Sequence, residues 1–146
     1  MDYRKLTSPC GIDCFNCEIF KDNITDEFRK KIAPYLETIN KDPETFYCKG
    51  CRTSGCVFIL NECATKKCVE AKGLEFCSDC DSFPCNKFHP CLDGADKRPH
   101  NMKVFNLCRI KSIGFDEWVK ETKMNRGKYF KGKLIIGSGP KIDESK

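Results

Sequence analysis

Three pairs of cysteines, each separated by two residues, are the feature of this sequence best suited to chemistry. They are Cys14 and Cys17, Cys48 and Cys51, and Cys77 and Cys80. A Cys-x-x-Cys turn places two sulfur atoms on the same side of one tight loop, and zinc takes four soft or borderline ligands at the corners of a tetrahedron. Three such turns in a chain of 146 residues predict thiolate sites for metal ions, with zinc as the first choice.

Four more cysteines lie near these pairs and can complete the coordination shells: Cys10, Cys63, Cys68 and Cys85. We predict metal ligation by all ten and two or more zinc ions, because ten thiols suffice for two four-thiolate sites. The second pair can be closed locally by Cys63 and Cys68, or it can be joined by the third pair. Loop-closure entropy grows too slowly with length to choose between these arrangements.

The other three cysteines and the two histidines have weaker patterns. Cys108 lies on a helical apolar stripe and is expected in the core, since cysteine is among the most buried residue types. For Cys56 and Cys91, ligation and burial are equally supported. His89, four residues after Cys85, and His100 are expected at the surface or in hydrogen-bonded core positions rather than on metal.

The cysteine content also bears on the expected compartment. Thirteen cysteines in 146 residues indicate either a disulfide scaffold or metal sites. The N-terminal residues contain no apolar run resembling a signal peptide, and no stretch approaches the roughly 18 apolar residues of a membrane span. We therefore expect a cytoplasmic protein without a membrane partner, whose thiols stay reduced and bind metal.

An iron–sulfur cluster is the main alternative to zinc. The spacing Cys10-x-x-x-Cys14-x-x-Cys17 is the one with which radical S-adenosylmethionine enzymes hold a four-iron cluster. Those enzymes usually carry an aromatic residue directly before the third cysteine, where this chain has Asn16, and the chain lacks the length and strand pattern for their partial barrel. A smaller electron-transfer or redox protein with a cluster on thiolates stays compatible with the sequence.

Charge is unevenly distributed along the chain. Residues 1–95 hold 13 basic and 15 acidic side chains, whereas residues 96–146 hold 13 basic and 6 acidic ones. The formal net charge of +5 assumes neutral cysteines, so it says little about partners. The segment from Lys120 to Lys133, with Tyr129 and Phe130 among its basic residues, suits nucleic acid through phosphate contact and base stacking. The alternative is a solvated helix end and an arm that packs on the acidic half.

Apolar periodicity and capping residues predict the elements that position these groups. Helices are expected over residues 25–39, with Thr25 as N-cap and Pro34 as a point of strain; over 64–72, ended by Gly73; from Ser82 to about Pro90; and from Met102 to Gly114. Another helix is expected after Phe115, with Asp116 as its N-cap. The run from Cys56 to Leu60 is too short to assign.

The tail and the overall class complete the expectation. Residues 129–136 suit a small hairpin or a bound arm, and residues 137–140 are expected to end the ordered region. We predict a small metal-stapled domain, mainly short α-helices and irregular loops with little or no β-sheet. It would span residues 1–119 and be followed by a basic C-terminal extension over residues 120–146.

The motifs together resemble a known family of small microbial cysteine-rich proteins, catalogued as domain of unknown function 3795. The matching segments occur in the family's order: CGIDCFNC from Cys10, CKGC from Cys48, the stretch from Cys63 to Gly73, CSDC from Cys77 and FPC from Phe83, with a closing helix from Arg109 to Trp118. The resemblance covers residues 9–119, implies zinc binding and assigns no activity. Family members often carry a further cysteine pair after the tryptophan helix, and this chain has no cysteine there.

Signatures of the common catalytic classes are missing from the sequence: it has no H-E-x-x-H, G-x-S-x-G, P-loop or Rossmann glycine motif. We therefore favour a binding or adaptor module with structural zinc and an unidentified protein partner over an enzyme.

Overall fold

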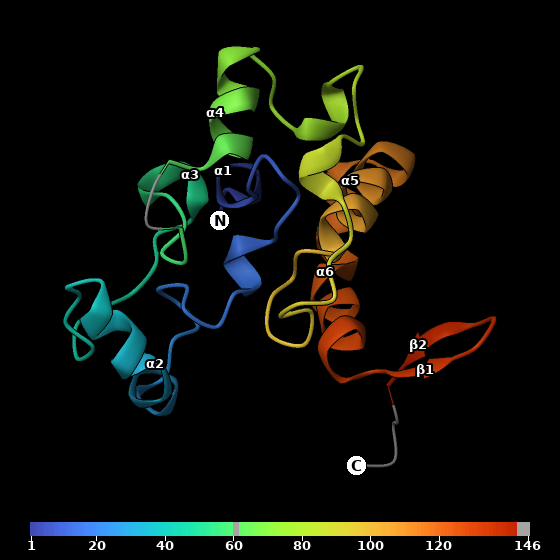
Figure 1. Cartoon of the computed structure of the whole chain (residues 1–146). Helices are drawn as coiled ribbons and strands as arrows, with labels where there is room; N and C mark the ends of the chain where they lie inside the picture. The colour runs from blue at the N-terminus through green and yellow to red at the C-terminus, as the bar shows by residue number, and fades with distance from the viewer. Residues whose placement is uncertain (60–61, 143–146) are drawn as a thin grey trace. The chain divides into compact units, whose positions relative to one another are not determined.

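The computed structural model describes residues 1–59 and 62–142. Over these residues the chain forms six α-helices, three short 3-10 helices and one two-stranded sheet (Figure 1). It divides into two compact units, of which unit 1 comprises residues 1–9 and 13–73, and unit 2 comprises residues 10–12 and the chain from Leu74 onward. The predicted fold class, short helices and loops with little β-sheet, is confirmed. No helix of the described residues is long and apolar enough to cross a membrane.

Unit 1 consists of short helices joined by loops: α1 (Tyr3–Leu6), η1 (Cys14–Asn16), α2 (Asp26–Thr38), α3 (Cys51–Ser54) and α4 (Ala64–Ala71). Helix α1 packs against both η1 and α3. The buried apolar side chains are few: Phe15, Ile19, Phe20, Leu36, Cys51 and Val69. Since Phe15 lies within η1 and Cys51 begins α3, two of the cysteine turns contribute directly to the core.

The two helices predicted in this unit are confirmed, and so are the residues that bound them. The hydroxyl of Thr25 accepts a hydrogen bond from the backbone N–H of Phe28 at 3.1 Å and caps α2. Pro34 lies inside α2, which continues to Thr38. Gly73 follows α4 with φ +65°, and its N–H donates to the carbonyl of Glu70. A glycine at this position ends a helix because it adopts positive φ without steric cost.

Unit 2 is built on two longer helices, α5 (Met102–Ile113) and α6 (Phe115–Lys131), which lie side by side in Figure 1. Leu107 and Trp118 are completely buried, and the ring of Phe115 stacks on that of Phe76 with centroids 5.9 Å apart. The unit also contains η2 (Cys77–Asp79), which packs against α5, and η3 (Asn86–Phe88).

The start of α6 differs from the prediction. Gly114, with φ +84°, is the residue between α5 and α6, and its carbonyl accepts a hydrogen bond from the N–H of Trp118. Asp116 is therefore in the first turn of α6 rather than its N-cap, a position that also suits a carboxylate because the helix N-terminus carries partial positive charge. The helix continues past residue 120 to Lys131.

A hairpin follows α6, as the sequence predicted, but it includes more of the tail. Strand β1 (Lys133–Ile135) pairs antiparallel with β2 (Gly139–Lys141), with Lys133 opposite Lys141. Residues 137–140, expected to end the ordered region, instead form the turn and part of β2. Glycines at 137 and 139 adopt positive φ, which lets the chain reverse there.

The helix expected from Ser82 to Pro90 is only the 3-10 turn η3, with Cys85 as its N-cap. A residue before proline disfavours the helical conformation, so His89, which precedes Pro90, ends the turn. The short apolar run from Cys56 forms a turn in which the Ile59 N–H donates to the Cys56 carbonyl. Leu60, the last residue of that run, lies outside the described residues.

Candidate metal centre

The first cysteine pair forms a 3-10 turn. Residues 14–16 are η1, and the N–H of Cys17 donates to the carbonyl of Cys14 at 3.0 Å. Asp13, fully buried just before the turn, accepts a hydrogen bond on its carboxylate from the side-chain amide of Asn16 at 2.9 Å. Cys17 leaves the turn extended, at φ −73° and ψ 140°. Both thiols are therefore presented at the ends of one braced loop.

The third cysteine pair has the same backbone form. Residues 77–79 are η2, the N–H of Cys80 donates to the carbonyl of Cys77 at 3.2 Å, and Cys80 leaves extended at φ −88° and ψ 133°. Here the brace is the carboxylate of Asp79, which accepts the backbone N–H of Phe76 at 2.8 Å. In both turns the residue just before the second cysteine hydrogen-bonds to the residue just before the first.

The second pair is built differently. Cys48 is extended, Gly50 adopts φ +95°, and Cys51 begins α3. The backbone N–H of Gly50 points at the sulfur of Cys48, with a nitrogen–sulfur distance of 3.3 Å. The positive φ at position 50 explains why this turn carries a glycine.

Within unit 1 the first two pairs are tied together by backbone hydrogen bonds. The Cys48 N–H donates to the carbonyl of Ile19 at 2.8 Å, and the Cys48 carbonyl accepts the Lys21 N–H at 3.0 Å. These bonds form a parallel bridge between Phe20 and Cys48. Because the Phe20 N–H in turn donates to the Cys17 carbonyl at 3.0 Å, the two turns are connected through a few residues of backbone.

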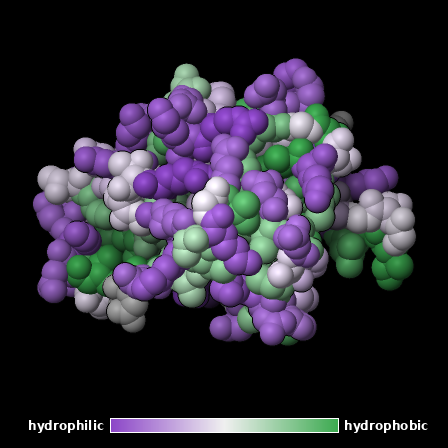
Figure 2. Space-filling view, turned by 90° about the horizontal axis from the view of Figure 1, so that it is seen from above, coloured by the Kyte–Doolittle hydropathy of each residue, from purple (hydrophilic) through white to green (hydrophobic). Residues whose placement is uncertain are grey.

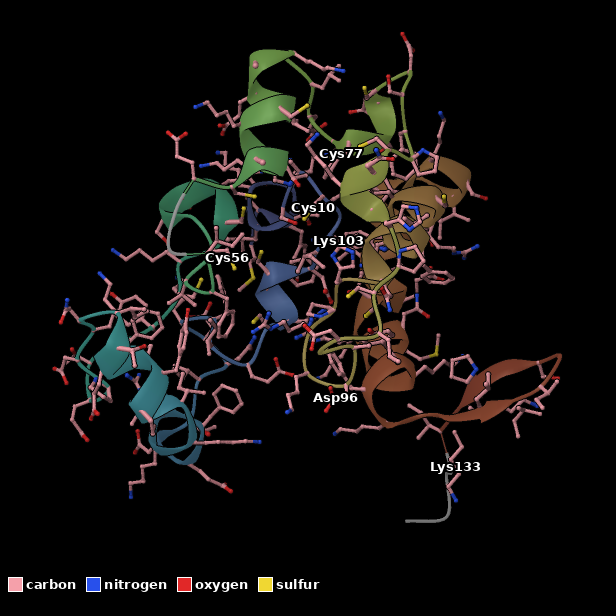
Figure 3. All side chains as sticks on the ribbon, in the orientation of Figure 1. Cys10, Cys56, Cys77, Asp96, Lys103 and Lys133 are labelled. Carbon is pink, nitrogen blue, oxygen red and sulfur yellow. The ribbon has the colours of Figure 1, made fainter. Side chains whose placement is uncertain are left out.

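Cys10 belongs to unit 2, apart from the rest of its motif. The carbonyl of the next residue, Gly11, accepts a hydrogen bond from the buried side-chain amide of Asn106 at 2.7 Å. Gly11 has φ +83°, and a Cβ there would lie 2.8 Å from Cγ of Leu107. Figure 3 labels Cys10, Cys77 and Lys103; Lys103 belongs to α5, and η2, which contains Cys77, packs against that helix.

Cys85 continues the loop that begins at η2. The Phe83 N–H donates to the Cys80 carbonyl at 2.9 Å, and the Phe88 N–H donates to the Cys85 carbonyl at 2.8 Å. The rings of Phe83 and Phe88 meet edge to face with centroids 5.3 Å apart. Cys77, Cys80 and Cys85 thus belong to one continuous, internally bonded loop of unit 2.

Cys63 and Cys68 both lie at α4. Cys63 is the N-cap, and its sulfur accepts the backbone N–H of Lys66 at a distance of 3.5 Å. Residues five apart on an α-helix are separated by roughly 140° around its axis. The two sulfurs are therefore not presented on one face of α4 as the two sulfurs of a Cys-x-x-Cys turn are.

The remaining candidates are distributed over both units. Cys56 is half-buried, and Cys91 is exposed. The prediction for Cys108 was wrong: it is exposed, because Leu107 and Asn106 occupy the buried face of α5 at that point. Both ring nitrogens of His100 have protein neighbours: Nε2 lies 2.7 Å from the His89 carbonyl and Nδ1 lies 3.2 Å from Lys103 Nζ.

The donor chemistry and the backbone turns fit zinc, while the side chains as placed do not yet enclose an ion. Among residues 1–59 and 62–142, no group of three or more His, Cys, Asp or Glu side chains is arranged to hold a metal. The structural roles of Asp13, Asn16 and Asp79, which brace the two 3-10 turns, and of Asn106, which bonds to Gly11, were not predicted from the sequence. A polar residue directly before the second cysteine of a pair was the available signal for Asn16 and Asp79.

Comparison with known proteins identifies the family and nothing closer. No curated protein and no solved structure matches the chain. The sequence model of a family described as "Protein of unknown function (DUF3795)" matches residues 6–90, which include all ten cysteines predicted as ligands. This match covers more than half of the chain, and the chain therefore belongs to the DUF3795 family.

Proposed function

We propose that this protein binds zinc through its cysteine thiolates and that the metal holds its fold together. The observation that carries the proposal is the repeated turn: Cys14–Cys17 and Cys77–Cys80 have the same 3-10 form with different bracing side chains. Two sulfurs at the ends of a rigid turn are half of a tetrahedral zinc site. In the second pair, the backbone N–H of Gly50 donates to the sulfur of Cys48 at 3.3 Å.

A structural role for the metal is supported by the small size of the apolar core. Hydrophobic residues make up 40% of the chain, and the 13 cysteines are counted among them. In unit 1, helices α2 and α4 each bury a single side chain, Leu36 in α2 and Val69 in α4. Units with so little apolar burial commonly depend on metal or disulfides, and the binding energy of a structural metal is then folding energy.

The test is metal analysis of protein purified without oxygen, followed by chelation. We expect two or more zinc ions per chain, no iron and no acid-labile sulfide. Complete removal of zinc should abolish the helical circular dichroism, and adding zinc back should restore it. Iron and acid-labile sulfide in the purified protein would show that the thiols bind an iron–sulfur cluster instead of zinc. Unchanged circular dichroism after complete zinc removal would refute the structural role of the metal.

We propose a binding or adaptor role for the module. The hairpin exposes apolar side chains, since Leu134 is 74% and Ile136 is 94% exposed. Figure 2 shows hydrophobic residues at the edge of the molecule where the hairpin of Figure 1 lies. Exposed apolar groups that cluster in this way are typical of interaction surfaces.

Nucleic-acid binding through the basic tail is a second candidate, supported by exposed lysines in the middle and at the end of α6 and on the hairpin: Lys123, Lys131 and Lys133. The aromatic residues between them are engaged within unit 2. The hydroxyl of Tyr129 donates to the Arg98 carbonyl at 3.3 Å, and the guanidinium of Arg126 lies 5.2 Å from the ring centre of Phe130. Phosphate contact by lysine, without base stacking, is therefore the mode we propose.

A further inference from the structure

The motif Cys10-x-x-x-Cys14-x-x-Cys17 is divided by the fold. Residues 10–12 belong to unit 2, whereas the chain from Asp13 to Gly73 belongs to unit 1. Three cysteines that are adjacent in the sequence are thus anchored to two different sets of neighbours.

Helix α5 anchors Cys10 together with the third cysteine pair. Asn106, 1% exposed, donates its side-chain amide to the carbonyl of Gly11 at 2.7 Å, and the absence of a Cβ at Gly11 allows its close approach to Leu107. The turn η2, which contains Cys77, packs against the same helix (Figure 3). Backbone hydrogen bonds extend this arrangement from Cys80 through Phe83 to the region of Cys85.

Unit 1 anchors the other two cysteines of the motif with the second pair. The bridge between Phe20 and Cys48 joins the chain leaving Cys17 to the chain entering the Cys48–Cys51 turn. Arg52, directly after that turn, donates from Nε to the carbonyl of Thr7 at 2.7 Å, and Thr7 pairs with Asp13 at the entrance to η1. Both sides of the two turns are therefore linked within this unit.

We propose that the ligands divide by unit into two four-thiolate zinc sites. One consists of Cys14, Cys17, Cys48 and Cys51, and the other of Cys10, Cys77, Cys80 and Cys85. This inference rests on the proposed zinc binding and adds which cysteines share an ion. Each unit then supplies the four thiols of one tetrahedral site. The sulfurs have to move together on binding, because among the described residues no three donors are already arranged for a metal.

Two consequences follow from this division. Cys63 and Cys68 are not needed for either site, in agreement with their separation around α4 and with the capping role of Cys63. A cluster of the radical S-adenosylmethionine type is disfavoured, because it would require the thiols of Cys10, Cys14 and Cys17 on one cofactor. The short link between Cys10 and Cys14 instead connects two ions.

Site-resolved alkylation of the zinc-loaded full-length protein tests the division. The variants are Cys10→Ser, Cys77→Ser and Cys14→Ser, with Cys91→Ser as the matched control at an exposed thiol. Each is treated briefly with N-ethylmaleimide, the reactivity of every remaining cysteine is mapped by mass spectrometry, and bound zinc is counted. Zinc-bound thiolates react more slowly than unbound ones, so each variant reports which thiols lose their ion.

Cys10→Ser and Cys77→Ser should each lose one zinc and expose the remaining members of the unit 2 site, while the unit 1 site stays protected. Cys14→Ser should lose one zinc and show the converse pattern, and Cys91→Ser should change neither. The division is overturned if Cys10→Ser exposes Cys14 and Cys17, or if single variants release both ions. A wild-type protein without zinc, whose alkylation is unaffected by chelator, would instead refute the proposed function itself.

Discussion

At the scale of single residues, the cysteine turns owe their form to polar neighbours rather than to the cysteines. Asn16 reaches back to Asp13 in one turn, and Asp79 accepts the N–H of Phe76 in the other. Different side chains thus brace the same backbone, since an amide and a carboxylate can each bind a group located three residues earlier. The way the thiols are presented therefore depends on residues other than the cysteines.

Gly11 provides a residue-scale prediction about how Cys10 is held. In Gly11→Ala the new Cβ would lie 2.8 Å from Leu107 Cγ, so we expect overpacking to cost about 1–3 kcal/mol in addition to the cost of an alanine at φ +83°. Gly137→Ala is the matched control, because Gly137 has φ +81° and no heavy atom within 4 Å of the added Cβ. Urea unfolding followed by circular dichroism measures both; equal losses would contradict the packing of Gly11 on α5.

The turns at the Cys-x-x-Cys pairs were predictable from the sequence, whereas the contacts that place Cys10 in unit 2 were not. A Cys-x-x-Cys spacing is a local signal, and two of the three pairs form the same 3-10 turn, while Cys51 of the other pair begins α3. The contact that assigns Cys10 to unit 2 joins Gly11 to Asn106, residues 95 positions apart. The local pattern of apolar residues cannot predict a contact over this sequence separation. In the sequence alone, nothing distinguishes Asn106 from other polar residues of the helix.

At the scale of elements, boundaries set by one residue type were predicted well. Thr25, Gly73 and Gly114 end or begin helices as expected, because capping depends on the side chain or the glycine itself. The start of α6 was misplaced by two residues, since Gly114 is both the C-cap of α5 and the N-cap of α6. The Cys108 assignment was also wrong, because two adjacent residues competed for one stripe of α5 and Leu107 is buried.

The junction of α5 and α6 yields an element-scale prediction. Arg109 on α5 makes two hydrogen bonds to Glu121 on α6, Nε to Oε1 at 2.8 Å and a second, to Oε2, at 2.9 Å. These bonds hold the pKa of Glu121 below its ordinary value, against the opposing effect of burial. We expect Glu121→Gln to lower the free energy of unfolding at neutral pH by about 0.5–1 kcal/mol, as the pair is partly exposed to solvent.

The pH dependence distinguishes this pair from a simple packing effect. A carboxyl group whose pKa is lowered on folding stabilises the protein above its unfolded pKa, and this stabilisation is lost as the pH falls through the folded value. The difference between wild type and Glu121→Gln should therefore shrink on acidification below about pH 4.5. Glu117→Gln, which removes the exposed pair with Lys120 inside α6, is the control and should cost less. Equal costs for the two variants would show that Arg109 does not link the helices.

At the scale of the whole molecule, the two units are not two halves of the sequence. Residues 10–12 are inserted in unit 2 although the residues on either side belong to unit 1. The chain therefore passes between the units twice within a few residues of the first cysteine motif. If each unit holds one ion, these passages make the N-terminal motif a covalent link between the two sites. Sequence spacing alone left open which cysteines of this motif share an ion, because spacing does not show which unit each residue joins.

The unequal distribution of charge gives the last prediction. Replacing Lys123, Lys131 and Lys133 with glutamine should weaken low-salt binding of RNA or DNA and reduce the slope of log affinity against log salt by about 0.7–0.9 per lost phosphate contact. Lys30, Lys31 and Lys41, exposed lysines of unit 1, provide a control with the same change in net charge. Fluorescence anisotropy over a salt series measures both variants.

Because the aromatic rings of Tyr129 and Phe130 are engaged within unit 2, binding should be insensitive to base sequence. Equal weakening by the two triple variants would assign binding to net charge alone, and no binding by the wild type at low salt would refute a nucleic-acid role for the tail.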